Sequence, residues 1–268
     1  MTRITTKFTQ LKKQGKKALI TYFTAGDPDL ATTAPIMHAL VKAGADMIEL
    51  GVPFSEPMAE GPVIEAAHHR ALKHGVTLSE VLKIAAEFRQ KDANTPIILM
   101  GYLNPFECMG YEKFARAAQT AGVDGVIVVD LPPEEAGEWL VQLKAHQIDP
   151  IFLTAPTTTS ARLQKICAVA SGYLYYVSLK GVTGSSKLNT VDVTEKLAEI
   201  RQHTQLPIAV GFGIRDATSA ANISKHADGV IVGTALVERI ACFAGQSEIL
   251  YQEVGTFIKE LRESIDKV

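Results

Sequence analysis

Short runs of apolar and β-branched residues recur along the chain at intervals of a few tens of residues. These runs cover residues 18–24, 47–52, 96–102, 125–130, 150–154, 173–178, 207–213 and 228–233. Each run is apolar at almost every position instead of alternating with polar residues. This pattern is typical of parallel strands that are covered on both faces.

Helical stretches separate these strands, for example residues 32–43, 78–90, 111–121 and 191–204. Two of them end at a glycine, Gly44 or Gly122, which is typical of a helix that stops in a left-handed residue. Eight repeats of strand and helix predict an α/β fold, the closed (β/α)8 or TIM barrel. We expect extra helices before the first strand, over residues 5–14, and after the eighth, over residues 247–267.

The alternative fold is a doubly wound open sheet, which has fewer strands and usually a glycine-rich turn after the first one. Here the first strand ends in Thr24-Ala-Gly-Asp-Pro28, which is not a dinucleotide-binding fingerprint. The chain also has no Pro/Ser-rich linker and no break in composition. We therefore expect residues 1–268 to form a single domain.

Composition narrows the function classes further. The chain is 47% hydrophobic and 21% charged, with a formal net charge of −2, close to the average of soluble globular proteins. Evenly spread, balanced charge argues against nucleic acid or an anionic membrane as the main partner. No apolar run approaches the ~18 residues of a membrane helix, and residues 1–8 lack the apolar core of a secretory signal. We expect a cytoplasmic protein.

The sequence predicts neither a disulfide framework nor a metal site. The three cysteines, Cys108, Cys167 and Cys242, lie far apart in the chain. His68 and His69 are adjacent on a predicted helix, and the spacing to His74 does not give a pair of ligands one turn apart.

One carboxylate stands out at the end of the second predicted strand. Period-two alternation places Ile48, Leu50 and Val52 on one face and Glu49 on the other. Since barrel enzymes carry their chemistry at the C-terminal ends of the strands, we expect Glu49 to point into the barrel near that rim. Burial raises the pKa of a carboxyl group, and a raised pKa suits a general acid/base near neutral pH.

The loop after this strand holds a second candidate carboxylate, Glu60. Residues 53–62 contain three prolines and lead into a helix with Pro62 near its start. Because proline restricts the backbone, we expect Glu60 to be held near the barrel mouth. Glu60 is also in a place where the helix dipole favours an acidic residue, and both interpretations can hold.

Glycines gather in the loops after the last three predicted strands. Glycine lets backbone N–H groups approach an anion closely, a helix N-terminus adds a favourable dipole, and this region is the common phosphate site of barrels. We therefore expect the phosphate group of a ligand to be bound at Gly184, Gly213, Gly233 and Thr234. Residues 181–187 also have the composition of a mobile loop that closes over a ligand.

Several segments together resemble the tryptophan synthase alpha subunit family, and the resemblance spans the whole chain. They are residues 23–28, 48–55, 61–62, 100–105, 130–132, 181–184 and 211–214. The segment 48–55 with the loop that follows it is highly specific to that family. The glycine motifs alone are shared by many phosphate-binding barrels.

The resemblance implies a lyase of tryptophan biosynthesis that cleaves indole-3-glycerol phosphate to indole and glyceraldehyde 3-phosphate. Indole would pass to a pyridoxal-phosphate-dependent beta subunit in an alpha2-beta2 complex, and this chain would carry no cofactor itself. By similarity Glu49 is the general acid/base, Glu60 holds the indole N–H, and Tyr175 supports the chemistry by hydrogen bonding. Thr183 would contact Glu60 when its loop closes. The implied walls of the substrate site are Tyr22, Met100, Ile127, Val129, Leu153, Thr183 and Phe212.

The chain departs from the family's loop pattern, Ser-Asp-Pro-x-Ala-Asp-Gly-Pro, because Glu56 and Glu60 replace both aspartates. Glu60 keeps the charge but carries it about one C–C bond length further from the backbone. Tyr22 also stands where phenylalanine is common. Two other functions stay open: a barrel isomerase acting on a related phosphate, and a catalytically weak regulatory subunit that binds the phosphate ligand. The two glutamates motivate the second of these.

Overall fold

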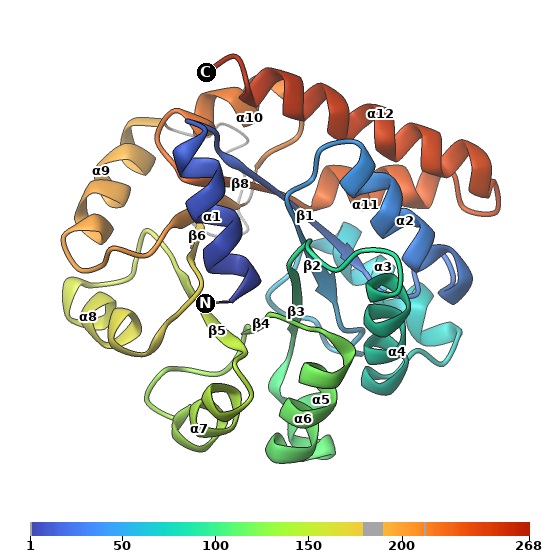
Figure 1. Cartoon of the computed structure of the whole chain (residues 1–268), viewed down its shortest axis with the longest axis horizontal. Helices are drawn as coiled ribbons and strands as arrows, with labels where there is room; N and C mark the ends of the chain where they lie inside the picture. Colours follow the sequence, from blue (N-terminus) through green and yellow to red (C-terminus); the bar gives the residue numbers. More distant parts are fainter. Residues whose placement is uncertain (1, 179–189, 212) are drawn as a thin grey trace.

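A computed structural model shows strands and helices alternating around a closed parallel barrel (Figure 1). The structure describes residues 2–178, 190–211 and 213–268. The strands pair in chain order, and the last pairs with the first to close the barrel. The predicted (β/α)8 TIM barrel is confirmed.

The strands lie where the apolar pattern predicts them, with bounds that agree to within two residues at either end. They are β1 (Ala18–Thr24), β2 (Met47–Gly51), β3 (Ile97–Gly101), β4 (Gly125–Val128), β5 (Asp149–Thr154), β6 (Leu174–Val177), β7 (Ile208–Gly211) and β8 (Gly229–Val232).

The predicted helices are also present, and the helix before β1 and the one at the C-terminal end of the chain are both found. The helices are α1 (Arg3–Lys13), α2 (Leu30–Lys42), α3 (Pro62–Lys73), α4 (Leu78–Arg89), α5 (Leu103–Met109), α6 (Tyr111–Ala121), α7 (Gly137–Ala145), α8 (Ser160–Val169), α9 (Thr190–Arg201), α10 (Ala217–Ser224), α11 (Thr234–Cys242) and α12 (Ser247–Ile265). Gly122 ends α6 in the left-handed conformation, with φ of 78°. The short α5 was not predicted, and for α7, α8, α10 and α11 the strand–helix repeat predicted a helix without giving its bounds.

The strands carry two apolar layers, one toward the helices and one inside the barrel. Ile48, Leu50 and Val52 pack in the layer that faces the helices, whereas Met47 packs inside the barrel. The alternation predicted for β2 is therefore confirmed, and it directs the side chain of Glu49 inward.

Helix α1 closes the N-terminal end of the barrel (Figure 1). Its apolar residues Ile4, Phe8 and Leu11 pack in the same cluster as the inward-facing strand residues. The ring of Phe8 lies 5.8 Å from that of Tyr173, measured between centroids. With this end filled by side chains, access to the barrel interior is left to the opposite, C-terminal end.

Polar contacts fix α1 to the strands it covers. Thr2 donates a hydrogen bond to Asp149 Oδ2 at 2.6 Å. The buried carboxylate of Asp124 pairs with Arg3 at 2.8 Å and with Arg89 at 2.6 Å, and it accepts the backbone N–H of Ile97. Asp124 therefore joins α1, the end of α4 and the start of β3.

We expect Asp124→Ala to lower the free energy of unfolding by about 3 kcal/mol, because it leaves the largely buried Arg89 guanidinium without the carboxylate that balances its charge. Urea denaturation would measure the loss. The matched control is Glu112→Ala, which breaks an exposed pair with Arg116 within α6 and should cost about 0.5 kcal/mol or less. Equal effects of the two substitutions would contradict this account.

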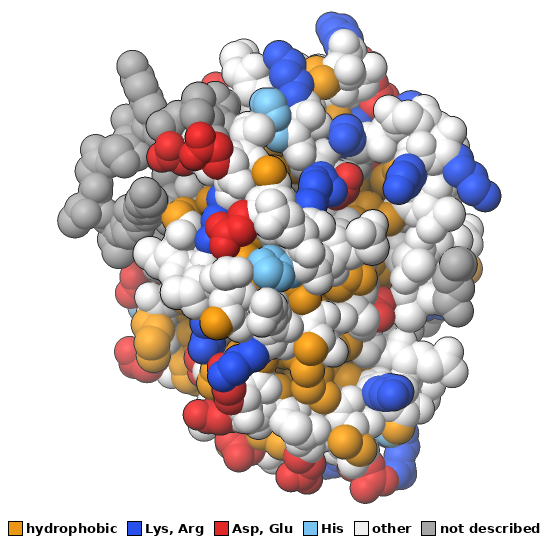
Figure 2. Space-filling model, turned by 90° about the vertical axis from the view of Figure 1, so that its left-hand side faces the viewer, with side chains coloured by type: hydrophobic (Ala, Val, Ile, Leu, Met, Phe, Trp, Pro, Cys, Tyr) orange, Lys and Arg blue, Asp and Glu red, His pale blue; other side chains and the backbone are white. Residues whose placement is uncertain are grey.

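The surface carries charges of both signs. On the face drawn in Figure 2, basic and acidic side chains are scattered among uncharged ones, and some of opposite sign lie next to each other. Among the described residues, no helix has the length and apolar character needed to cross a membrane.

Candidate active site

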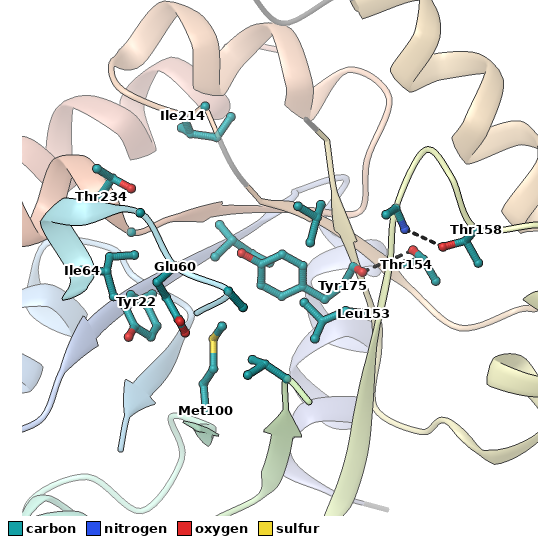
Figure 3. A pocket seen from close by; sticks show the side chains of 18 residues that line it. Tyr22, Glu60, Ile64, Met100, Leu153, Thr154, Thr158, Tyr175, Ile214 and Thr234 are labelled. Atoms are coloured by element: carbon teal, nitrogen blue, oxygen red, sulfur yellow. Dashed lines mark hydrogen bonds between the residues drawn. The ribbon is translucent and has the colours of Figure 1, made fainter. Parts of the chain in front are cut away.

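A cavity of about 340 Å³ lies at the C-terminal ends of the strands (Figure 3). This volume is within the range of small-molecule binding pockets. The predicted site residues that line it are Tyr22, Glu60, Met100, Val129, Leu153, Tyr175, Gly213, Gly233 and Thr234. They come from seven strands or strand ends and from the loop before α3, so the closed barrel brings distant segments together.

Two predicted site residues are placed below this cavity. Ile127 points into the barrel but packs in the interior cluster and does not line the cavity. Glu49 also points inward, and its side chain is fully buried. Three further predicted residues, Thr183, Gly184 and Phe212, lie outside the described part of the chain.

The buried carboxyl of Glu49 has one hydrogen-bond partner among the described residues. The hydroxyl of Tyr173 donates to Glu49 Oε1, whereas Oε2 has no partner in the described part of the structure. Burial raises the pKa of Glu49 to about 8, although the Tyr173 hydrogen bond acts in the opposite direction. Glu49 is therefore mostly protonated at pH 7, as a general acid requires.

Glu60 stands on the wall of the cavity, directly before α3. Its Oε2 accepts a hydrogen bond from the Tyr102 hydroxyl, and the same hydroxyl accepts the backbone N–H of Ala59 at 2.8 Å. Helix α3 begins at Pro62, as the sequence predicts. Partial burial raises the pKa of Glu60 to about 7, while the Tyr102 hydrogen bond opposes the shift. Near neutral pH, Glu60 therefore loses its proton more readily than Glu49.

Two tyrosines of the cavity wall lie over glycines of neighbouring strands. A Cβ built on Gly51 would stand 2.6 Å from the Tyr22 hydroxyl, and one built on Gly211 would clash with the phenol of Tyr175. Gly211 therefore serves to leave room for Tyr175, a role that the glycine pattern did not reveal. Figure 3 shows the Tyr175 ring projecting into the cavity, with Tyr22, Glu60 and Met100 grouped to one side.

Glycines and a helix N-terminus form another part of the cavity wall. Gly213 has a φ of 82°, which glycine adopts without strain, and Gly233 precedes the first residue of α11, Thr234. No side chain among the described residues caps α11, so its first N–H groups are available to a ligand. No Lys or Arg lies among the described residues that line the cavity. An anion bound here would be held by backbone N–H groups and the helix dipole.

Sequence reasoning missed Tyr102 and Tyr173, the hydroxyl partners of the two carboxyl groups. Tyr102 directly follows β3, so the rule about C-terminal strand ends could have indicated it. Tyr173 precedes β6 and is two residues before Tyr175, which gives both side chains the same inward direction. Tyr173 lies at the N-terminal end of the strand, whereas the rule expects chemistry at the C-terminal end. The rule therefore does not indicate Tyr173.

The described residues contain no group of three or more His, Cys, Asp or Glu side chains that could hold a metal ion. His68, whose spacing in the sequence did not favour a metal site, has a buried ring that contacts Tyr22 and the backbone of Phe54.

Comparison with known proteins places this geometry in a family. The family model for the tryptophan synthase alpha chain matches residues 8–266. A tryptophan synthase alpha chain from Thioalkalivibrio sulfidiphilus is 56% identical, over 99% of this chain and 100% of the relative. The crystal structure of tryptophan synthase subunit alpha from Legionella pneumophila str. Paris aligns over 100% of both chains, with a TM-score of 0.93 and 43% identity. A tryptophan synthase structure from M. tuberculosis aligns over 99% of this chain and 100% of that chain, with a TM-score of 0.88 and 32% identity. The chain belongs to the tryptophan synthase alpha chain family.

Proposed function

We propose that this protein cleaves indole-3-glycerol phosphate to indole and glyceraldehyde 3-phosphate. The observation that carries the proposal is the placement of two carboxyl groups: Glu49 is fully buried in the barrel, where burial raises its pKa to about 8, and Glu60 lies on the cavity wall. The cleavage needs a proton at indole C3 and the removal of a proton from the glycerol hydroxyl next to the breaking bond. It also needs an anionic group at the indole N–H. Two carboxyls with different protonation states meet these needs.

Glu49 is the proposed general acid/base. It gives its proton to indole C3, and its carboxylate then takes the hydroxyl proton as the C–C bond breaks and the aldehyde forms, so it ends protonated again. Glu49 does not line the cavity while it accepts the Tyr173 hydrogen bond. We therefore infer that its side chain turns away from Tyr173 to reach the substrate, since proton transfer needs hydrogen-bond distance.

Glu60 and Tyr175 are proposed to act on the indole part of the substrate. The ionised Glu60 accepts the indole N–H and stabilises the positive charge that develops when C3 is protonated. Tyr102 holds the Glu60 carboxylate from the side of the protein. Tyr175, whose phenol reaches into the cavity, supports the chemistry by hydrogen bonding.

The remaining contacts are proposed to position the substrate. Its phosphate binds at the N-terminus of α11 and at Gly213, Gly233 and Thr234. Gly184 is assigned to the phosphate from the sequence alone. Its apolar walls include Tyr22, Met100, Val129 and Leu153, which line the cavity. Phe212 and Thr183 are assigned to this site by resemblance alone, and Ile127 supports it from the layer below.

The pKa values predict a narrow pH optimum. We expect kcat/KM for indole-3-glycerol phosphate to rise around pH 7, as Glu60 loses its proton, and to fall around pH 8, as Glu49 loses the proton it must donate. The sign follows from the roles: Glu60 works ionised and Glu49 enters the reaction protonated. Initial rates of indole release from pH 5.5 to 9.5 would measure the profile. A rate that keeps rising through pH 8 would remove Glu49 from the role of initial proton donor.

A direct assay tests the proposed reaction. The purified chain is incubated with indole-3-glycerol phosphate, alone and with its cognate beta subunit, and indole release is followed. Indole is expected in both cases. Its absence in both would contradict the proposal.

A phosphate-binding regulatory subunit is the second candidate, since Glu49 lies below the cavity and not on its wall. That function predicts substrate binding and a change in beta-subunit activity without indole release. An isomerase would instead convert the phosphate to an isomer without releasing indole.

The proposal extends to the setting in which the chain works. A beta subunit is the proposed partner in an alpha2-beta2 complex, and pyridoxal phosphate belongs to that partner and not to this chain. We propose that residues 1–268 work as one domain, supported by the pairing of β1 with β8 near opposite ends of the chain. We also propose a cytoplasmic location, in keeping with a biosynthetic enzyme.

A further inference from the structure

A buried imidazole that the proposed chemistry does not use lies next to the cavity wall. His68 on α3 is 1% exposed. Its Nδ1 accepts the backbone N–H of Phe54 at 3.0 Å, and its Nε2 lies 3.2 Å from the Tyr22 hydroxyl oxygen. The ring thus contacts both the loop that leads to Glu60 and a residue of the cavity wall.

The Phe54 contact decides which nitrogen of His68 carries the proton. A backbone N–H can only donate, so Nδ1 is unprotonated and the single proton of the neutral ring is on Nε2. Nε2–H therefore donates to the Tyr22 hydroxyl oxygen, and Tyr22 keeps its own proton available to another acceptor. Burial lowers the pKa of His68 to about 4, so the ring stays neutral at physiological pH.

The two partners of His68 are linked to the reactive part of the site. The Tyr22 ring lines the cavity, and its hydroxyl lies against Gly51, where a side chain would not fit. The Phe54 ring stacks on Tyr102, with centroids 4.9 Å apart, and Tyr102 holds the Glu60 carboxylate.

We propose that His68 is a positioning residue: its neutral ring fixes the loop between β2 and α3 at Phe54 and orients the Tyr22 hydroxyl on the cavity wall. The contact to Phe54 sets the place of Glu60, and the contact to Tyr22 sets the surface that the indole meets. This inference rests on the proposed function for its kinetic consequences, but its hydrogen-bond geometry can be tested separately.

Two substitutions separate the two contacts. In His68→Leu both hydrogen bonds are lost, and we expect kcat to fall on the order of tenfold because the loop that carries Glu60 loses its fixed position. In His68→Asn the side-chain oxygen can take the place of Nδ1 but cannot reach Tyr22. We therefore expect the kcat of His68→Asn to lie within about threefold of the parent value. Its KM should be about threefold higher than that of the parent, because the hydrogen bond to Tyr22 is lost.

The matched control is His74→Asn, at the exposed C-terminal end of the same helix, which should change neither constant. Urea denaturation of each variant would show that it is folded. Equal kcat values for His68→Leu and His68→Asn would overturn the assignment of the loop contact.

Tyr22→Phe tests the second contact, because it removes the hydroxyl and leaves the ring. It should raise KM by about as much as His68→Asn, and the double variant should show little further increase, since both substitutions break the same hydrogen bond. Additive increases in KM would overturn the proposed orientation of Tyr22 by His68.

A spectroscopic measurement tests the geometry without any assay of activity. In protein labelled with ¹⁵N-histidine, we expect one imidazole to stay neutral and protonated on Nε2 down to about pH 5, and its signals to disappear in His68→Asn. A charged ring or one protonated on Nδ1 would overturn the inference even if the protein releases indole. The expected spectrum from a protein that releases no indole would instead contradict the proposed function alone.

Discussion

Replacing Glu49 by glutamine should lower kcat for indole release by about 10²–10⁴-fold, the usual contribution of a general acid/base. Glutamine keeps the size of the side chain and can still accept the Tyr173 hydrogen bond, but it has no proton to give to indole C3. Because Glu49 lies below the cavity wall, we expect the affinity for substrate to change by no more than a few-fold.

The measurement combines single-turnover rates of indole release with calorimetric titration of indole-3-glycerol phosphate. Glu65→Gln, at an exposed position in the first turn of α3, is the control and should behave like the parent protein. Full turnover by Glu49→Gln would show that another group transfers the proton.

Replacing Glu60 by glutamine should lower kcat by about 10²–10³-fold, the range found when one electrostatic partner of a transition state is removed. The Tyr102 hydroxyl can donate to the amide oxygen of glutamine, so the local structure is expected to persist. What is lost is the negative charge that stabilises the protonated indole.

Glu60→Asp separates the effect of the negative charge from the effect of the side-chain length. Aspartate keeps the charge but is shorter by about one C–C bond, so it withdraws from Tyr102. We expect it to retain more activity than Glu60→Gln, as judged by kcat for indole release. Glu56→Gln, assayed without the beta subunit, is the control in the same exposed loop. A larger loss in Glu60→Asp than in Glu60→Gln would mean that position outweighs charge at this site.

The inward direction of Glu49 could be predicted because strand alternation is local: Ile48 and Leu50 on one face leave Glu49 on the other. Its partner could not be predicted in the same way. Tyr173 is 124 residues further along the chain, and only the closure of the barrel brings its hydroxyl to Glu49. Contacts between inward-facing side chains depend on how the strands are staggered around the barrel, which no single strand indicates.

The same stagger explains the placement of Ile127. It pairs with Met100 across β3 and β4, yet Met100 lines the cavity and Ile127 lies in the layer below. Strands in a barrel are tilted against its axis, so residues paired in register stand at different depths. The side chain of Ile127 does face inward, as the wall of a substrate site requires, but its depth in the barrel could not be obtained from the sequence.

Helix α1 leaves the ribosome before every strand of the barrel, yet two of its polar partners, Asp124 and Asp149, are made more than a hundred residues later. At about 5–20 residues per second the interval is on the order of ten seconds. Until then Ile4, Phe8 and Leu11, which the finished barrel buries, have no native surface to cover them. The nascent chain is thus expected to present an amphipathic helix to chaperones until the strands that cover this helix have been made.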